Sequence, residues 1–170
     1  MSDNQVLDTI RERRSVREFI DRDVPSELLD KLLFAGTWAP SGFNNQPWRF
    51  FIVKEAKKKE ALSKLTSYGR IILSAPVCIA VFMDSHASYH RIKDAMAIGA
   101  CNQNILLAAH SLGLGGVWLG EILKSKEAVR VLLGAPEPYE LMAVLAIGYP
   151  TKKKRTSKRS DASDVTFFNY

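Results

Sequence analysis

Three arginines and one serine lie within five residues near the start of the chain, in the run Arg13-Arg14-Ser15-Val16-Arg17. A guanidinium group keeps its positive charge and presents paired donors that match the oxygens of a phosphate group. A serine hydroxyl among such groups adds a further donor. These residues therefore indicate a site for one phosphate group, and the alternative is a solvated basic helix end favoured by the helix dipole.

A second group of polar side chains, Ser41, Asn44 and Gln46, lies in a loop between Pro40 and Pro47. Amide side chains offer both donors and acceptors, which is what recognition of the edge of a heteroaromatic ring requires. Asparagine is also a common turn residue, so the loop taken alone favours a structural role. A simple turn does not need the glutamine.

The elements around these two groups determine where they lie. Apolar residues at helical spacing predict a first helix over residues 5–13, so the arginine cluster begins where this helix ends. Pro25 suits the first turn of a second helix, which ends near Thr37, just before the amide-rich loop. Aromatic and β-branched residues after the loop predict a strand over residues 48–54.

The rest of the chain predicts a sheet packed against a long helix. Continuous apolar runs over residues 77–83 and 141–147 predict buried strands, and a helix over residues 89–112 is apolar on nearly all sides. Burial of every side of that helix in a domain of this size needs a second chain. The shorter elements expected are helices over 55–65 and 125–133 and a strand through Trp118. We therefore expect an α+β fold with a central mixed sheet flanked by helices, one domain over residues 1–170, and a homodimer.

Composition and spacing argue against several other classes of protein. No apolar run suits a signal peptide or a membrane span, so we expect a cytoplasmic protein without a membrane partner. The net charge of +6 comes from local clusters without interleaved aromatics, so nucleic acid is not an expected partner. Cys78 and Cys101 lie in apolar segments and are expected to be buried thiols, and the histidines lack ligand spacing, so no metal is expected. The glycines that follow Leu112 do not form a dinucleotide fingerprint, because Trp118 stands where the third glycine is required.

Four segments in this order resemble the nitroreductase family: residues 13–19, residues 39–48, the pair Gln103-Asn104, and residues 112–120. The resemblance extends from about Val6 to Pro150. It implies an α+β nitroreductase-like fold and an intertwined homodimer. It also implies one noncovalent FMN in each of two sites between the subunits, with NADH or NADPH as the electron donor.

The resemblance assigns cofactor-binding roles to residues in three of these segments: Arg13, Arg14, Ser15, Arg17, Pro40, Ser41, Asn44, Gln46, Leu119 and Gly120. The first segment is implied to hold the phosphate and ribityl groups, with Arg17 beside the pyrimidine edge. In the loop, the two amides are implied to lie beside the flavin ring, and the Pro-Ser pair to reach the flavin of the partner chain. The backbone of the last two residues is implied to face the reactive N5 atom.

The basic tail over residues 151–170 has a role only through the resemblance. Lys158 and Arg159 fall where the family places its last phosphate-binding cations, although Arg155 makes the register ambiguous. Val165, Phe167 and Phe168 are too apolar for a solvated tail, so we expect the end of the chain to pack on the body or, as the family implies, on the partner subunit.

The implied function is an oxidoreductase that passes a hydride from a nicotinamide to FMN and then two electrons to a nitroaromatic compound, a quinone or another electron-poor small molecule. No catalytic residue is expected, because the flavin carries the chemistry. Other chemistry on the same fold stays open, namely flavin reduction, enone reduction and dehalogenation. Two nonenzymatic alternatives are an FMN carrier and a basic module that binds anions or nucleic acid.

Overall fold

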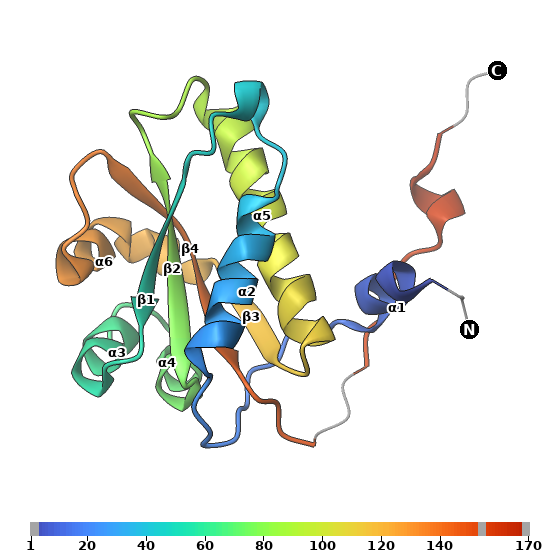
Figure 1. Ribbon diagram of the computed structural model, residues 1–170, viewed down its shortest axis with the longest axis horizontal. Coiled ribbons are helices and arrows are strands. Elements are labelled where there is room, and N and C mark those ends of the chain that lie inside the picture. Colours follow the sequence, from blue (N-terminus) through green and yellow to red (C-terminus); the bar gives the residue numbers. More distant parts are fainter. Residues whose placement is uncertain (1–3, 153–155, 168–170) are drawn as a thin grey trace.

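The computed structural model describes residues 4–152 and 156–167. Its centre is a four-stranded sheet in the order β1-β2-β4-β3 (Figure 1). The strands are β1 (Trp48–Val53), β2 (Val77–Asp84), β3 (Gly115–Leu119) and β4 (Tyr139–Gly148). The two buried strands predicted from continuous apolar runs are β2 and β4, which lie side by side in the middle of the sheet.

The sheet differs in one respect from the mixed sheet that we predicted. All three pairings of these strands are antiparallel, and the described residues show a parallel contact only as an isolated bridge between Ser15 and Gly116. A continuous apolar run is typical of parallel strands because helices cover both of their faces. Here helices cover both faces of an antiparallel sheet, so all eight residues of β2 are buried and the alternating pattern is lost.

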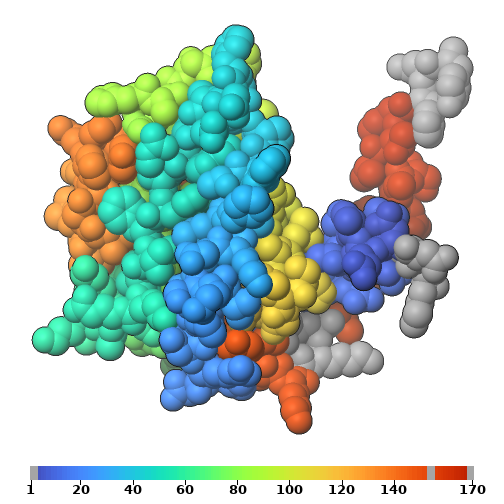
Figure 2. Space-filling view, viewed as in Figure 1, coloured from blue at the N-terminus to red at the C-terminus, as the bar shows by residue number. Residues whose placement is uncertain are grey.

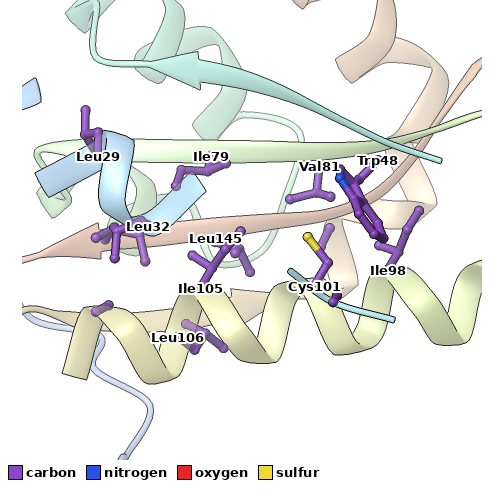
Figure 3. Packing of buried hydrophobic residues seen from close by; sticks show 14 of the residues in the cluster. Leu29, Leu32, Trp48, Ile79, Val81, Ile98, Cys101, Ile105, Leu106 and Leu145 are labelled. Atoms are coloured by element: carbon purple, nitrogen blue, oxygen red, sulfur yellow. The ribbon is translucent and has the colours of Figure 1, made fainter. Parts of the chain in front are cut away.

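Two layers of helices produce this burial. On one face, α2 (Ser26–Thr37) and α5 (Arg91–Ser111) pack on the sheet, and Figure 3 shows Leu32 and Ile105 from these helices beside Leu145 of β4. The other face is covered by α3 (Ala56–Ser63), α4 (Gly69–Ser74) and α6 (Lys126–Leu133). The six-residue α4 was not predicted, because it is too short to show a helical period.

Short 3₁₀ turns lie between α2 and β1 and between β3 and α6, namely η1 (Gly42–Asn44) and η2 (Glu121–Ser125), and η3 (Ala162–Val165) lies in the tail. Cys78 and Cys101 are buried free thiols, as predicted. Among the described residues, no helix has the length and apolar character needed to cross a bilayer.

The first helix, α1 (Gln5–Glu12), lies outside the layers that cover the sheet and touches the end of α5 (Figures 1 and 2). The Asn4 side chain caps it by accepting hydrogen bonds from the backbone N–H groups of Val6 and Leu7. The apolar side of α1 is not covered by its own chain, since Val6 is 65% exposed and Ile10 is 50% exposed. Val6 lines an open groove together with Trp38 at the end of α2 and Leu107 of α5, and this groove leaves much of the apolar side of α1 exposed.

The end of the chain is also uncovered. Val165 is 67% exposed and Phe167 is 91% exposed, so these residues do not pack on the body of their own chain. The prediction that the end of the chain packs on the body of its own chain is therefore wrong for Val165 and Phe167. Phe168 lies outside the described residues. The long helix α5 is covered on one side by the sheet and α2, whereas Met96 on another side is 70% exposed. The described residues therefore leave apolar side chains of α1, of α5 and of the tail open to a partner.

Candidate functional site

The arginine cluster lies on an extended segment that is fixed against the sheet. The chain leaves α1 at Glu12, and the backbone N–H of Val16 then donates to the Gly116 carbonyl in β3 at 3.0 Å. Val16 is buried, and a side chain at Gly115 would meet it, since a Cβ there would lie 2.5 Å from Val16 Cγ2. A glycine at position 115 thus lets the arginine segment approach β3 closely.

This segment lines a pocket of about 480 Å³ together with part of the tail. The lining residues are Arg13, Arg14, Ser15, Arg17, Glu18, Thr156, Ser157 and Arg159. The structure therefore brings together four of the predicted site residues from the first segment and one from the tail, across more than 140 positions of sequence. Lys158 does not line this pocket, and Arg155 lies outside the described residues.

The pocket gathers positive charge. Four arginines line it and Glu18 is its single lining carboxylate among the described residues. Burial lowers the pKa of the Arg13 guanidinium, and the charges of Arg14 and Arg159 lower it further. The Nε atoms of Arg13 and Arg14 are buried without a hydrogen-bond partner among the described residues. A phosphate group bound in the pocket would accept hydrogen bonds from the guanidinium groups that line it and would offset their mutual repulsion.

The end of β3 extends from this pocket. Ser15 forms its bridge with Gly116, and Gly120 lies four residues further on, which corresponds to about 13 Å of extended strand. Leu119 is buried and Gly120 is exposed, so the backbone at Gly120 is accessible from outside. The arginine segment and the accessible backbone at Gly120 therefore lie toward opposite ends of β3.

Glu121, which follows Gly120, fixes the strand end to a neighbouring turn. Its carboxylate accepts hydrogen bonds from the Thr66 hydroxyl at 2.6 Å and from the backbone N–H of Ser67 at 3.1 Å. Together with the nearby Lys124 ammonium, these donors hold the pKa of Glu121 at about 2. The carboxylate therefore stays ionised at neutral pH and keeps the strand end and the 66–67 turn together.

The amide-rich loop has an unusual backbone. Phe43, Asn44 and Gln46 all have positive φ angles, of 52°, 55° and 47°. For residues other than glycine this conformation costs on the order of 1–3 kcal/mol each, and such residues often cluster at functional sites. The backbone N–H of Gln46 donates to the Ser41 hydroxyl at 3.1 Å, and its side-chain amide donates to the Asn44 carbonyl at 3.3 Å.

The loop and the arginine pocket lie at opposite ends of α5. Asn45 donates to Asp94 in the first turn of this helix at 2.8 Å, whereas Arg13 and Arg14 share a cavity with Leu106 and His110 near its other end. Positions 94 and 110 on one helix are about 24 Å apart. Within one chain, the structure therefore does not bring Pro40, Ser41, Asn44 and Gln46 to the pocket.

The sequence model of the Nitroreductase family matches residues 10–67 and 63–149. This chain belongs to the nitroreductase family. A Methanothermobacter thermautotrophicus protein named as a candidate NADH dehydrogenase/NAD(P)H nitroreductase is 39% identical over 169 residues, which is 97% of this chain and 87% of that protein. The resemblance that the four segments indicated is confirmed.

Solved structures of nitroreductase-fold proteins superpose closely on this chain. A crystal structure from Desulfovibrio desulfuricans, named as a candidate nitroreductase in complex with FMN, has a TM-score of 0.94 and 39% identity, covering 99% of this chain and 98% of that one. The NADPH:FMN oxidoreductase of Vibrio harveyi complexed with NAD⁺ has a TM-score of 0.89 and 26% identity, covering 98% of this chain and 78% of that one.

The sequence is also similar to an enzyme with a different name. A Thermotoga neapolitana iodotyrosine deiodinase is 30% identical over 181 residues, covering 92% of this chain and 94% of that protein.

Three residues that support this nitroreductase fold were missed in the sequence: Asn45, Asp94 and Glu121. Each acts through partners that are distant in sequence, since Asn45 and Asp94 are 49 positions apart and Glu121 and Thr66 are 55 apart. Asp94 had a recognisable signal, because it is an acidic residue in the first turn of the longest helix. Asn45 and Glu121 had no such signal in the sequence.

Proposed function

We propose that this chain is an FMN-dependent oxidoreductase that takes a hydride from NADH or NADPH and transfers two electrons to a small electron-poor acceptor, such as a nitroaromatic compound or a quinone. Family membership and the names of its relatives support the general class, an NAD(P)H-dependent flavin enzyme. The acceptor class and the alternating use of one site by donor and acceptor are our proposal.

The observation that carries the proposal is the arginine pocket. Four arginines, Arg13, Arg14, Arg17 and Arg159, line it, and Glu18 is the single carboxylate among its described lining residues. A terminal phosphate suits this pocket because it has three acceptor oxygens and up to two negative charges. The donor set thus fits the phosphate of FMN.

The residues of the chain then have separate tasks. Arg13, Arg14 and Arg159 would hold the phosphate, and the Ser15 hydroxyl would donate to the phosphate or the ribityl chain. Arg17 would stabilise negative charge at the pyrimidine edge. The backbone at Gly120 would face the flavin ring, and Glu121 keeps that strand end in place. FMN supplies the hydride transfer itself, so no acid or base of the protein is required.

A homodimer completes the site. The loop with Pro40, Ser41, Asn44 and Gln46 lies about 24 Å along α5 from the pocket residues of its own chain, so it serves the flavin bound by the other subunit. The exposed apolar residues of α1 and of the tail supply surfaces that the partner covers. The dimer therefore contributes directly to the cofactor site.

We expect the purified protein to be yellow and to release FMN, not FAD, on heating. The pocket suits one terminal phosphate, and the sequence has no adenine-binding fingerprint. Chromatography of the released chromophore identifies it. Release of FAD would contradict the assignment of the pocket, and a protein that binds no flavin after reconstitution with excess FMN would favour a basic anion-binding module.

A further inference from the structure

The Asp94 carboxylate connects the strained loop to the start of α5. Its side chain is completely buried, with 0% of its surface exposed. One oxygen accepts hydrogen bonds from the Ser88 hydroxyl at 2.7 Å and from the backbone N–H groups of Tyr89 and His90 at 3.1 and 3.0 Å. The other oxygen accepts the bond from the Asn45 amide at 2.8 Å. A single buried carboxylate thus holds two segments of chain together.

Asn45 makes the connection on the side of the loop. Its amide nitrogen donates to the Ala87 carbonyl at 3.0 Å as well as to Asp94, so both bonds attach the loop to the segment that begins α5. Asn44 and Gln46 flank it on either side and carry the amides that the family resemblance assigns to the flavin ring. Fixing residue 45 therefore restricts the backbone on both sides of it, from which the two amide side chains extend.

The loop needs such an attachment because its own conformation is unfavourable. Phe43, Asn44 and Gln46 all have positive φ angles, and residues other than glycine keep this conformation only where surrounding contacts impose it. Tyr89 adds a second contact, since its ring lies 5.1 Å from that of Phe43 and its hydroxyl fills the space that a side chain at Gly42 would need. The three residues that make these contacts with the loop, Ala87, Tyr89 and Asp94, all belong to the segment at the start of α5.

We propose that Asp94, acting through Asn45, is a positioning residue that holds Asn44 and Gln46 in place for the flavin ring. This inference rests on the proposed function. Asp94 does not touch the cofactor. Its hydrogen bonds set the conformation of the loop, and the loop presents the amides to the flavin of the partner chain.

Two substitutions test the connection from its two ends. Asn45→Ala removes the link and leaves the bonds of Asp94 to residues 88–90 intact, whereas Asp94→Asn removes the negative charge that accepts from Asn45 and from residues 88–90. We expect each variant to raise the FMN dissociation constant, Asn45→Ala at least tenfold, in a fluorescence titration. Because both changes weaken the bond between these two side chains, the loss of binding free energy in the double variant should be smaller than the sum of the two single losses.

A second readout separates positioning from a general loss of structure. Amide N–H groups that donate to the ring stabilise the electron-rich reduced form more than the oxidised form, so both variants should lower the midpoint potential of the bound flavin. If the reduced form loses tenfold more affinity than the oxidised form, the potential of this two-electron couple falls by about 30 mV. A change that only reduced the amount of folded protein would leave the potential of the remaining holoprotein unchanged.

Glu140→Gln is the matched control. Glu140 also holds the start of α5, through bonds from Arg91 at 2.9 and 2.8 Å, and its other described partner, Lys126, lies outside the loop as well. We expect its FMN affinity and potential to equal those of the parent. If the parent binds FMN and Asn45→Ala changes neither affinity nor potential, the positioning role is wrong. If Asp94→Asn does not fold, the result with Asn45→Ala alone tests the positioning role. A parent protein that binds no FMN would instead contradict the proposed function.

Discussion

Replacing Arg159 by alanine is expected to raise the FMN dissociation constant at least tenfold. Arg159 is the described tail cation that lines the arginine pocket, and its charge already affects the pKa of Arg13. A hydrogen bond to a charged group contributes roughly 1.5 to 3 kcal/mol, and about 1.4 kcal/mol corresponds to a tenfold change in affinity. Fluorescence titration with FMN measures the effect.

Lys158→Ala is the control for charge alone. Lys158 carries the same charge and is adjacent in sequence, but it does not line the pocket. We expect its FMN affinity to change by no more than about twofold, because exposed charges are screened by solvent. Equal losses in the two variants would show that the tail acts through its overall charge and not through a contact of Arg159.

Truncation after Pro150 extends this test to the dimer. The truncated chain lacks Arg159 and also the exposed apolar residues Val165 and Phe167. We expect weaker FMN binding together with partial dissociation in sedimentation experiments, whereas Arg159→Ala should stay dimeric. A truncated protein that remains dimeric and binds FMN as tightly as the parent would show that the tail is a solvated appendage.

Arg17→Ala is expected to lower the midpoint potential of bound FMN by roughly 30 mV. The reduced flavin carries negative charge around N1 and O2, and a fixed cation there stabilises it. A unit charge at about 4 Å contributes on the order of 4 kcal/mol at an effective dielectric constant of 20. Because Arg17 is exposed, solvent screening reduces this, and a net loss of about 1.4 kcal/mol corresponds to 30 mV for two electrons.

Arg11→Ala is the matched control for this measurement. Arg11 is an exposed arginine on α1 that pairs with Asp8 at 2.9 Å and does not line the pocket. Its removal should leave the potential unchanged, which excludes a general effect of net charge. An Arg17→Ala protein that still binds FMN with an unchanged potential would show that Arg17 holds the cofactor without tuning it.

Much of the fold could be predicted because its signals are local. Helical spacing predicted α1, and the apolar runs predicted β2 and β4 close to their actual bounds. Whether neighbouring strands run parallel or antiparallel could not be predicted from local sequence patterns. An antiparallel sheet covered on both faces has the same continuous apolar runs as a parallel one, so the mixed sheet was a wrong prediction.

The site residues also fall into those that a local pattern could predict and those that depend on how distant segments pack. Arg13, Arg14, Ser15 and Arg17 are close in sequence, so their spacing alone indicated a phosphate site, and the structure places them in one pocket. The link between Asn45 and Asp94 depends on how α5 packs beside the loop, which no local pattern encodes. Arg159 was assigned to the cofactor only through the family resemblance, and its position in the pocket is a tertiary feature.

The anaerobic reduction of the bound flavin tests the central claim most directly. The purified protein is reconstituted with FMN and mixed without oxygen with NADH or NADPH, while the visible absorbance of the flavin is followed. We predict that at least one of the two nicotinamides bleaches the flavin and that a nitroaromatic compound or a quinone then restores the colour. A flavin that dithionite bleaches but that stays oxidised with both nicotinamides would contradict the proposed oxidoreductase and leave a flavin carrier.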